Sequence, residues 1–154
     1  MKKRSNSITR FEELNWMEID SLDRDKTIFF QPISPMEEHG PHLPVGTDFM
    51  ICRDATIEAM RILKKKKKNL NYILLPTIPV GYSKIARDFP GTISVSSSAI
   101  KDIVYGVGSS LARHSFKFLI ICTYHMDLMH LKGIYAGIRK TRRKYPYFLN
   151  KKLE

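Results

Sequence analysis

The chain has few of the residues that staple small secreted domains or that fill membrane spans. It contains only two cysteines, Cys52 and Cys122, each in an apolar context, so we expect buried thiols of a reducing compartment rather than a disulfide. No stretch approaches the ~20 consecutive apolar residues of a membrane span. The basic start of the chain, residues 1–14, is not followed by an apolar run and so does not resemble a secretory signal. These absences predict a cytoplasmic protein.

Acidic residues are also scarce: 15 Asp and Glu stand against 26 Lys and Arg, which gives a formal net charge of +11. Such an excess suggests a nucleic-acid partner. Much of it, however, lies in residues 64–68 and 139–144, at the ends of two expected helices, where cations are favoured by the helix dipole. No aromatic residues interleave with the first run, as binding to single-stranded nucleic acid would require. We therefore do not expect a nucleic-acid partner.

The 154 residues, of which 43% are hydrophobic, are enough for a single domain, 1–154, with a core. Short apolar runs predict strands, and longer amphipathic runs predict helices. We expect strands at 27–33, 72–75 and 116–122, and helices at 11–22, 47–63, 99–111 and 128–144. The third strand is the most apolar and is expected at the centre of the sheet. Alternating strands and helices predict an α/β fold with a parallel sheet.

Ligand-type side chains gather directly after two of these strands. The stretch MEEHGPHLPVGTD, Met36 to Asp48, follows the first strand and contains two glutamates, two histidines and an aspartate. His125 and Asp127 follow the third strand. Because the carboxyl ends of parallel strands lie on one edge of a sheet, where ligands usually bind, we expect these side chains to meet.

Five of these side chains form a mixed nitrogen and oxygen set that suits Zn²⁺, Mn²⁺ or Fe²⁺. They are Glu37, His39, Asp48, His125 and Asp127. The number suits two metals that share a bridging carboxylate and hold a hydroxide between them for hydrolysis. A structural interpretation stays equally open on spacing alone, because Asp48 is also a plausible helix N-cap and a histidine at a strand end is often only hydrogen-bonded.

Two further residues of the same stretch are candidate catalytic residues. Glu38 lies between two of the candidate ligands but faces the opposite way in an extended segment, which suggests proton transfer or indirect support of the ligands. His42, within GPHLP, is the second candidate, and the alternative is that it only orders the turn.

The stretch EEHGPHLPVGTD, residues 37–48, resembles the signature loop of the creatininase (creatinine amidohydrolase) family, and the similarity extends to FPGT at 89–92 and to the helix and strand before His125. The resemblance implies a three-layer α/β sandwich with a mainly parallel sheet, two divalent metal ions, hydrolysis of amide C–N bonds other than peptide bonds, and homo-oligomers. By position, Glu37 and His39 would each bind one metal and Asp48 would bridge them. His125 and Asp127 fall on the remaining ligand positions, and at Asp127 the family has a glutamate.

The chain departs from the family pattern in three places. Ahead of FPGT, residues 86–88 (ARD) stand where many members have a glutamate–histidine pair. Larger residues flank His125, where the family has Asn-Gly before and Gly-Gly after the histidine. Family members usually continue further, so we expect this chain to hold the N-terminal part of the family fold, shortened at the C-terminus. The sequence thus favours a metal-dependent amidohydrolase acting on a small cyclic or linear amide. The alternative is a truncated, non-catalytic relative that binds only a metal or a partner.

Overall fold

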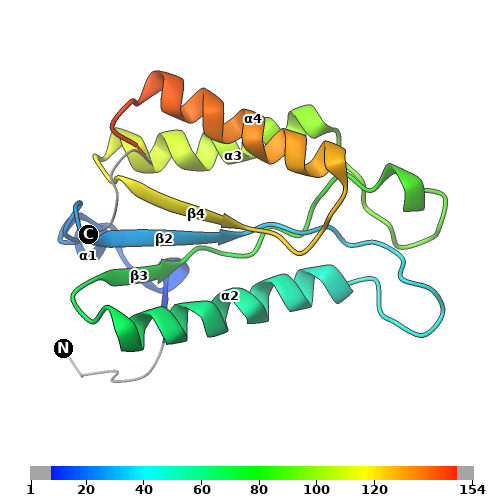
Figure 1. The fold of residues 1–154 in the computed structure, drawn as a ribbon, viewed down its shortest axis with the longest axis horizontal. Coiled ribbons are helices and arrows are strands. Elements are labelled where there is room, and N and C mark those ends of the chain that lie inside the picture. Colours follow the sequence, from blue (N-terminus) through cyan, green and yellow to red (C-terminus); the bar gives the residue numbers. More distant parts are fainter. Residues whose placement is uncertain (1–7, 149–154) are drawn as a thin grey trace.

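The computed structural model describes residues 8–148, which form three layers around a parallel sheet (Figure 1). Helices α3 (Ser97–Arg113) and α4 (Leu128–Lys144) cover one face of the sheet, and α2 (Thr47–Lys66) covers the other. The four strands lie in the order β1-β3-β2-β4, and every neighbouring pair is parallel. They are β1 (Thr9–Arg10), β2 (Thr27–Pro32), β3 (Asn71–Leu74) and β4 (Phe118–Cys122). The expected α/β sandwich with a parallel sheet is confirmed.

The centre of the sheet is β2, not the most apolar strand. All six residues of β2 are buried, and it pairs with both β3 and β4, for example through Ile28 with Tyr72 and Phe118. β4 stands at the end of the strand order, so its expected central place is wrong. An apolar strand is one whose faces are covered, which does not require strands on both of its edges. The α3–α4 layer covers one face of β4.

The helices begin and end where local chemistry requires. Ser96 caps α3 through its hydroxyl, which accepts from the Ala99 N–H, and Asp127 caps α4. The lysine run forms the last turn of α2, as expected. The single helix expected at 11–22 is instead a 3₁₀ turn, η1 (Phe11–Glu13), followed by α1 (Trp16–Asp20). Asn15 starts α1 with a capping box and thereby separates the two.

The core has a part on each side of the sheet. Towards α3, Phe29 meets Phe116 edge to face at 4.9 Å between ring centroids. Towards α2, Met60 is fully buried against the aromatic side chains of β2 and β3. Cys52 is buried and Cys122 partly so; both thiols are free, and burial raises the pKa of each. Within residues 8–148, no helix is long and apolar enough to cross a membrane.

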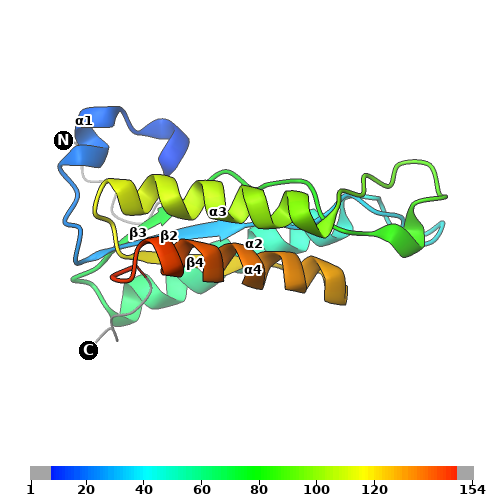
Figure 2. The same ribbon diagram turned by 90° about the horizontal axis from the view of Figure 1, so that it is seen from above.

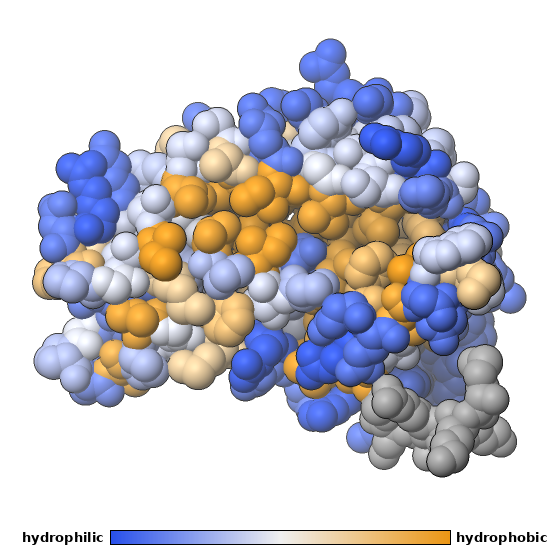
Figure 3. Space-filling model, turned by 180° about the vertical axis from the view of Figure 1, so that it is seen from behind, coloured by the Kyte–Doolittle hydropathy of each residue, from blue (hydrophilic) through white to orange (hydrophobic). Residues whose placement is uncertain are grey.

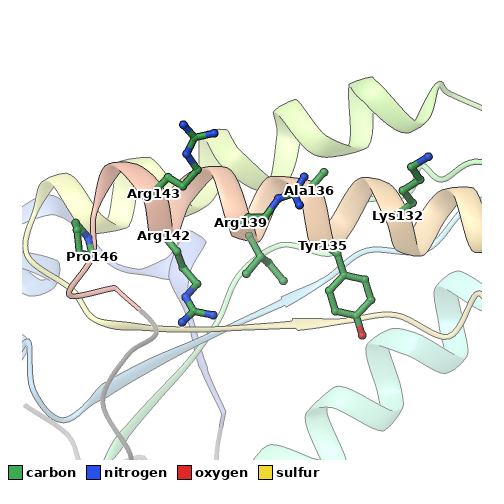
Figure 4. Close-up of a pocket in the computed structure, with 8 residues that line it drawn as sticks. Lys132, Tyr135, Ala136, Arg139, Arg142, Arg143 and Pro146 are labelled. Carbon is green, nitrogen blue, oxygen red and sulfur yellow. The ribbon is translucent and has the colours of Figure 1, made fainter.

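Seen from above, α3 and α4 run side by side over the sheet (Figure 2). From behind, apolar side chains form a band across the molecule (Figure 3). A groove of about 470 Å³ lies between α3 and the segment after β3. Its apolar lining comprises Phe11, Leu75, Pro76, Ile78, Val107 and Leu111. A second groove, of about 740 Å³, lies along α4 and is lined by Tyr135, Arg139 and Arg143 among others (Figure 4).

Candidate metal centre

Three segments that are far apart in the sequence meet at the carboxyl edge of the sheet. The loop after β2 brings Glu37 and His39, the first turn of α2 brings Asp48, and the segment after β4 brings His125. Glu37, Asp48 and His125 each offer one ligand atom, and these three atoms all lie within 4.8 Å of one another. The meeting of the two strand ends follows from the parallel topology.

Asp48 lies at the centre of this cluster and faces a histidine with each of its oxygens. Its Oδ1 is 3.1 Å from His39 Nε2, and its Oδ2 is 3.1 Å from His125 Nδ1. Glu37 Oε1 lies 3.0 Å from the same His125 nitrogen and 4.0 Å from His39 Nε2. The side chains of Asp48, Glu37 and His125 are buried, and that of His39 is 23% exposed.

The far nitrogen of each histidine is fixed by a backbone carbonyl. His39 Nδ1 is 3.0 Å from the Glu37 carbonyl oxygen, and His125 Nε2 is 2.8 Å from the Tyr82 carbonyl oxygen. Because a carbonyl can only accept, these two ring nitrogens carry the protons and donate them. In a neutral ring the other nitrogen then carries a lone pair, and both lone pairs face carboxylates. A cation between them, or a further proton on each ring, removes that repulsion.

Backbone geometry holds the loop that carries Glu37 and His39. The Glu37 N–H donates to the Val45 carbonyl at 2.9 Å, which closes the loop onto the start of α2. Gly40 has φ +76°, a conformation that residues with a side chain rarely adopt, and it lets the chain turn directly after His39. Asp48 lies in the first turn of α2, where the helix dipole favours a negative charge.

The protonation of His39 responds to these neighbours. The hydrogen bond to the Glu37 carbonyl raises the pKa of His39, burial acts against it, and the charges of Asp48 and Glu37 raise the pKa further. The ring is therefore held beside two carboxylates that favour its positively charged form. The same negative potential favours a bound metal cation, which would compete with that proton.

The other predicted site residues lie outside this cluster. Asp127 is occupied as the N-cap of α4, where its Oδ1 accepts from the Met129 and His130 N–H groups at 2.7 and 3.1 Å. Glu38 Oε2 accepts from the Gly40 N–H at 2.8 Å, and so faces its own loop. His42 is exposed on the same loop.

Three groups behind the cluster were not singled out from the sequence. The Tyr82 carbonyl and the buried Ser83, whose Oγ is 3.5 Å from His125 Nε2, come from an irregular segment without periodicity. His130 is fully buried, and its ring lies edge to face with that of His125 at 5.1 Å between ring centroids. A carbonyl contact is independent of residue type, so no sequence signal could have revealed the Tyr82 contact.

The fold and the cluster together define a parallel α/β protein with a histidine–carboxylate site at the carboxyl edge of its sheet. The sequence model of the creatininase family (creatinine amidohydrolase) matches residues 12–153, so the chain belongs to that family. Among solved structures, a creatinine amidohydrolase (creatininase) superposes with TM-score 0.76 at 23% identity, covering 92% of this chain and 53% of the other. A structure described as the Mn form of creatininase gives TM-score 0.69 at 20% identity, covering 90% of this chain and 54% of the other.

A curated relative is the mycofactocin precursor peptide peptidase of Mycobacterium ulcerans (strain Agy99). It is 27% identical over 117 residues, which are 73% of this chain and 46% of the relative. The chain therefore spans about half the length of the curated relatives and solved structures that it matches.

Proposed function

We propose that this chain is a metal-dependent amidohydrolase that cleaves an amide C–N bond at the Asp48 cluster. The observation that carries the proposal is the geometry around Asp48. Each of its two oxygens lies 3.1 Å from a ring nitrogen of a histidine, and the other ring nitrogen of each histidine is hydrogen-bonded to a backbone carbonyl. Histidines oriented in this way by an outer hydrogen bond are typical of metal sites.

The residues fit divalent metal ions by their chemistry. Glu37, Asp48 and His125 offer oxygen and nitrogen donors close together in a buried site, and His39 approaches Asp48 from the other side. Imidazole and carboxylate together suit Zn²⁺ or Mn²⁺, and also Fe²⁺. We propose two ions, which Glu37, His39, Asp48 and His125 would hold. When bound, such ions polarise the amide carbonyl and make water a nucleophile near neutral pH.

The chain's own residues would then divide the remaining work. His39 and His125 are oriented by carbonyls, so in their neutral forms they direct the unprotonated nitrogen at the carboxylates without rearrangement. We propose Asp127 as a further ligand, which requires its carboxylate to serve the site as well as the cap of α4. Glu38 and His42, on the loop at the rim, are the proposed proton-transfer residues.

The substrate class is proposed from the relatives and from the surface around the site. Small cyclic or linear amides are one class, in keeping with the creatinine amidohydrolase family. Peptides are the other, because the curated relative is named a peptide peptidase. Exposed Tyr124, Met126 and Leu128 follow β4 beside the site and favour a substrate with apolar groups. We also propose that the protein is cytoplasmic and works as a homo-oligomer.

Metal content per folded chain tests the proposal, with Asp48→Asn as the decisive variant. Asn keeps the shape of Asp48 but removes its charge, so chelator-free protein should hold about two transition-metal ions and Asp48→Asn close to none by inductively coupled plasma mass spectrometry. The matched control is Asp54→Asn on the same helix, whose carboxylate is exposed and paired with Arg53, and which should retain the wild-type content. Equal metal content in both variants would refute the role of Asp48.

Two further measurements separate the remaining possibilities. Asp127→Asn preserves an N-cap, since Asn caps as well as Asp, so a loss of metal in this variant would reveal a ligand role for Asp127. Hydrolysis of creatinine, other small amides and peptides is then assayed with the metal-loaded protein. A chain that binds metal and turns over none of them is the non-catalytic relative.

A further inference from the structure

His130 lies behind the candidate metal centre and is fully buried, although it is not one of the residues whose ligand atoms cluster there. It belongs to the first turn of α4, where its backbone N–H donates to Asp127 Oδ1 at 3.1 Å. Its ring has two partners: Nδ1 accepts from the Tyr82 N–H at 3.4 Å, and Nε2 lies 3.1 Å from Thr123 Oγ1. Because a polar group buried without a hydrogen bond is costly, these two contacts allow a histidine to occupy this position.

The hydrogen atoms of these contacts follow from what each group can donate or accept. A backbone N–H only donates, so His130 Nδ1 carries a lone pair and Nε2 carries the proton of a neutral ring. Nε2 therefore donates to Thr123 Oγ1, which also accepts from the His125 backbone N–H at 3.3 Å. The hydrogen of the Thr123 hydroxyl is then left for Ser34 Oγ, which lies 3.4 Å away. Both nitrogens of His130 are thus in use, one as an acceptor and one as a donor.

The groups that His130 contacts are the same groups that hold His125. The Tyr82 carbonyl accepts from His125 Nε2 at 2.8 Å, while the N–H of Tyr82 donates to His130. Thr123 Oγ1 accepts both from the His125 backbone and from the His130 ring. The two imidazole rings also meet edge to face, with 5.1 Å between their centroids. His130 is therefore connected to the backbone of His125, to the far nitrogen of its ring, and to the ring itself.

The approach of the Tyr82 segment to His130 depends on a glycine at position 81. A Cβ built at Gly81 would lie 3.0 Å from His130 Nδ1 and 2.8 Å from Pro35 Cδ. A side chain at this position would push the segment away from His130, and the Tyr82 carbonyl would move with it. The segment is also held by the Val95 N–H, which donates to the Gly81 carbonyl at 2.8 Å. The contact between Tyr82 and His130 is thus a close one that the packing around Gly81 permits.

We propose that His130, together with Thr123, is a positioning residue of the candidate metal centre. His130 holds the backbone of Tyr82, and Thr123 holds the backbone of His125. The ring of His125 is thereby turned so that its Nδ1 lies 3.1 Å from Asp48 Oδ2. A donor atom that is already fixed binds a metal ion more tightly, because less freedom is lost on binding. The inference rests on the proposed function, and it adds that two residues outside the ligand set determine the affinity of the site.

Two other roles of His130 fit these observations less well. As a metal ligand it would have to give up its contact with Tyr82 or with Thr123, and it lies outside the group of close ligand atoms. As a purely structural residue it would stabilise the fold without affecting the ring of His125. Its hydrogen-bond partners, however, are the groups that hold that ring.

The first test observes the His125 ring in chelator-treated protein by proton NMR, and so needs no metal. The Nε2 proton should exchange slowly with water, and its signal is assigned by its absence in His125→Gln. Thr123→Val keeps the shape of the side chain but removes the hydroxyl, so it should speed this exchange at least about tenfold, whereas Thr123→Ser should restore slow exchange. The matched control is Thr141→Val, which removes a buried hydroxyl that donates to the Gly137 carbonyl in α4 and should leave the exchange rate within about twofold.

The second test measures the Co²⁺ affinity of the full chain by visible absorption. Thr123→Val and His130→Phe should bind Co²⁺ at least about tenfold more weakly than the wild type, with the same number of ions at saturation. His130→Phe keeps an aromatic ring beside His125 but removes both nitrogens, so it separates hydrogen bonding from packing. Thr123→Ser and Thr141→Val should stay within about twofold of the wild type. Circular dichroism checks that each variant is folded, and Thr123→Val decides the test should His130→Phe not fold.

The outcomes separate this inference from the proposed function. If the wild type binds no Co²⁺ but its ring proton responds to Thr123→Val and not to Thr141→Val, the hydrolase proposal fails and the positioning of His125 stands. If Co²⁺ binds and the two valine variants agree in both measurements, the inference is overturned and the metal site stands. Loss of one ion at saturation in His130→Phe would make His130 a ligand and would also overturn the inference. So would a wild-type ring proton that exchanges too fast to be observed, because the ring would then not be held.

Discussion

His130 is a neutral imidazole sealed behind the candidate metal centre. Its Nδ1 accepts from the Tyr82 N–H at 3.4 Å, and its Nε2 lies 3.1 Å from Thr123 Oγ1, to which it donates. Burial, with a further contribution from the neighbouring His125, lowers the pKa of His130 to about 4. His130 thus connects the segment after β3 to the segment after β4. His125 lies in the second segment and contacts the Tyr82 carbonyl of the first.

This depressed pKa predicts a specific acid sensitivity. In the unfolded chain His130 binds a proton below a pKa of about 6.5, but in the folded chain only below about 4. Stability is therefore present above pH 6.5 and falls as the pH drops from 6.5 to 4, by up to about 3 kcal/mol from this group. Urea unfolding of chelator-treated protein at several pH values measures the slope.

The variant His130→Gln isolates this contribution. It should be less stable than the wild type at pH 7, because the glutamine does not refill the buried site, yet its stability should fall less steeply between pH 6.5 and 4. Comparing the two proteins removes the contribution of the carboxylates, which they share. Parallel pH profiles would show that His130 is already protonated in the native state.

At the scale of elements, glycines set how closely α3 and α4 approach. A Cβ built at Gly137 would lie 2.7 Å from Val104 Cβ, and one at Gly133 would lie 2.7 Å from the Ser97 carbonyl oxygen. Gly106, on α3, has nothing within 4 Å of such an atom. A Cβ at Gly108, also on α3, would lie 2.9 Å from Thr141 Oγ1, so the consequence of a glycine here is set by its packing position rather than by its helix or by helix propensity.

Two alanine substitutions test this difference. Gly137→Ala should lower the free energy of unfolding by about 1–3 kcal/mol, because the new methyl group forces the helices apart. Gly106→Ala should raise it by about 0.4–1 kcal/mol, since alanine restricts the unfolded chain and meets no neighbour in α3. Thermal or urea unfolding of both variants provides the measurement. Stabilisation by Gly137→Ala would mean that the α3–α4 contact yields easily.

The sequence predicts elements better than it predicts their neighbours. The periodicity of 128–144 and the lysine run at the end of α2 were sufficient to predict these helices, because each depends on local chemistry. The two-residue β1 and the break at Asn15 were missed, since a short strand and a single cap leave little pattern. The place of β4 at the edge depends on strand order, which its apolar character does not encode.

The residues of the candidate site were predictable where the order of parallel strands alone brings them together. Glu37, His39 and Asp48 share one loop, and the parallel order of strands brings His125 to them. Asp127 is the N-cap of α4, which begins directly after it, and its role as a ligand stays a prediction. Capping and metal ligation compete for the same residue types, so spacing alone could not separate them.

At the scale of the whole molecule, the distribution of charge matters more than any one ion pair. The formal net charge is +11, and cations gather at the end of α2 and along the last turns of α4. Most acids pair with nearby cations at the surface, as Asp20 does with Arg24, and such exposed pairs contribute little. The remaining like charges repel one another more in the compact chain than in the unfolded chain.

We therefore expect salt to stabilise the protein. Raising sodium chloride from low to about physiological ionic strength shortens the screening length to about 8 Å and should raise the free energy of unfolding by about 1 kcal/mol. Urea unfolding at each salt concentration measures the change, and the variant Lys67→Gln with Lys68→Gln, just beyond α2, should show a smaller effect because less repulsion remains to be screened. A stability that falls with salt would mean that the surface ion pairs outweigh the excess of positive charge.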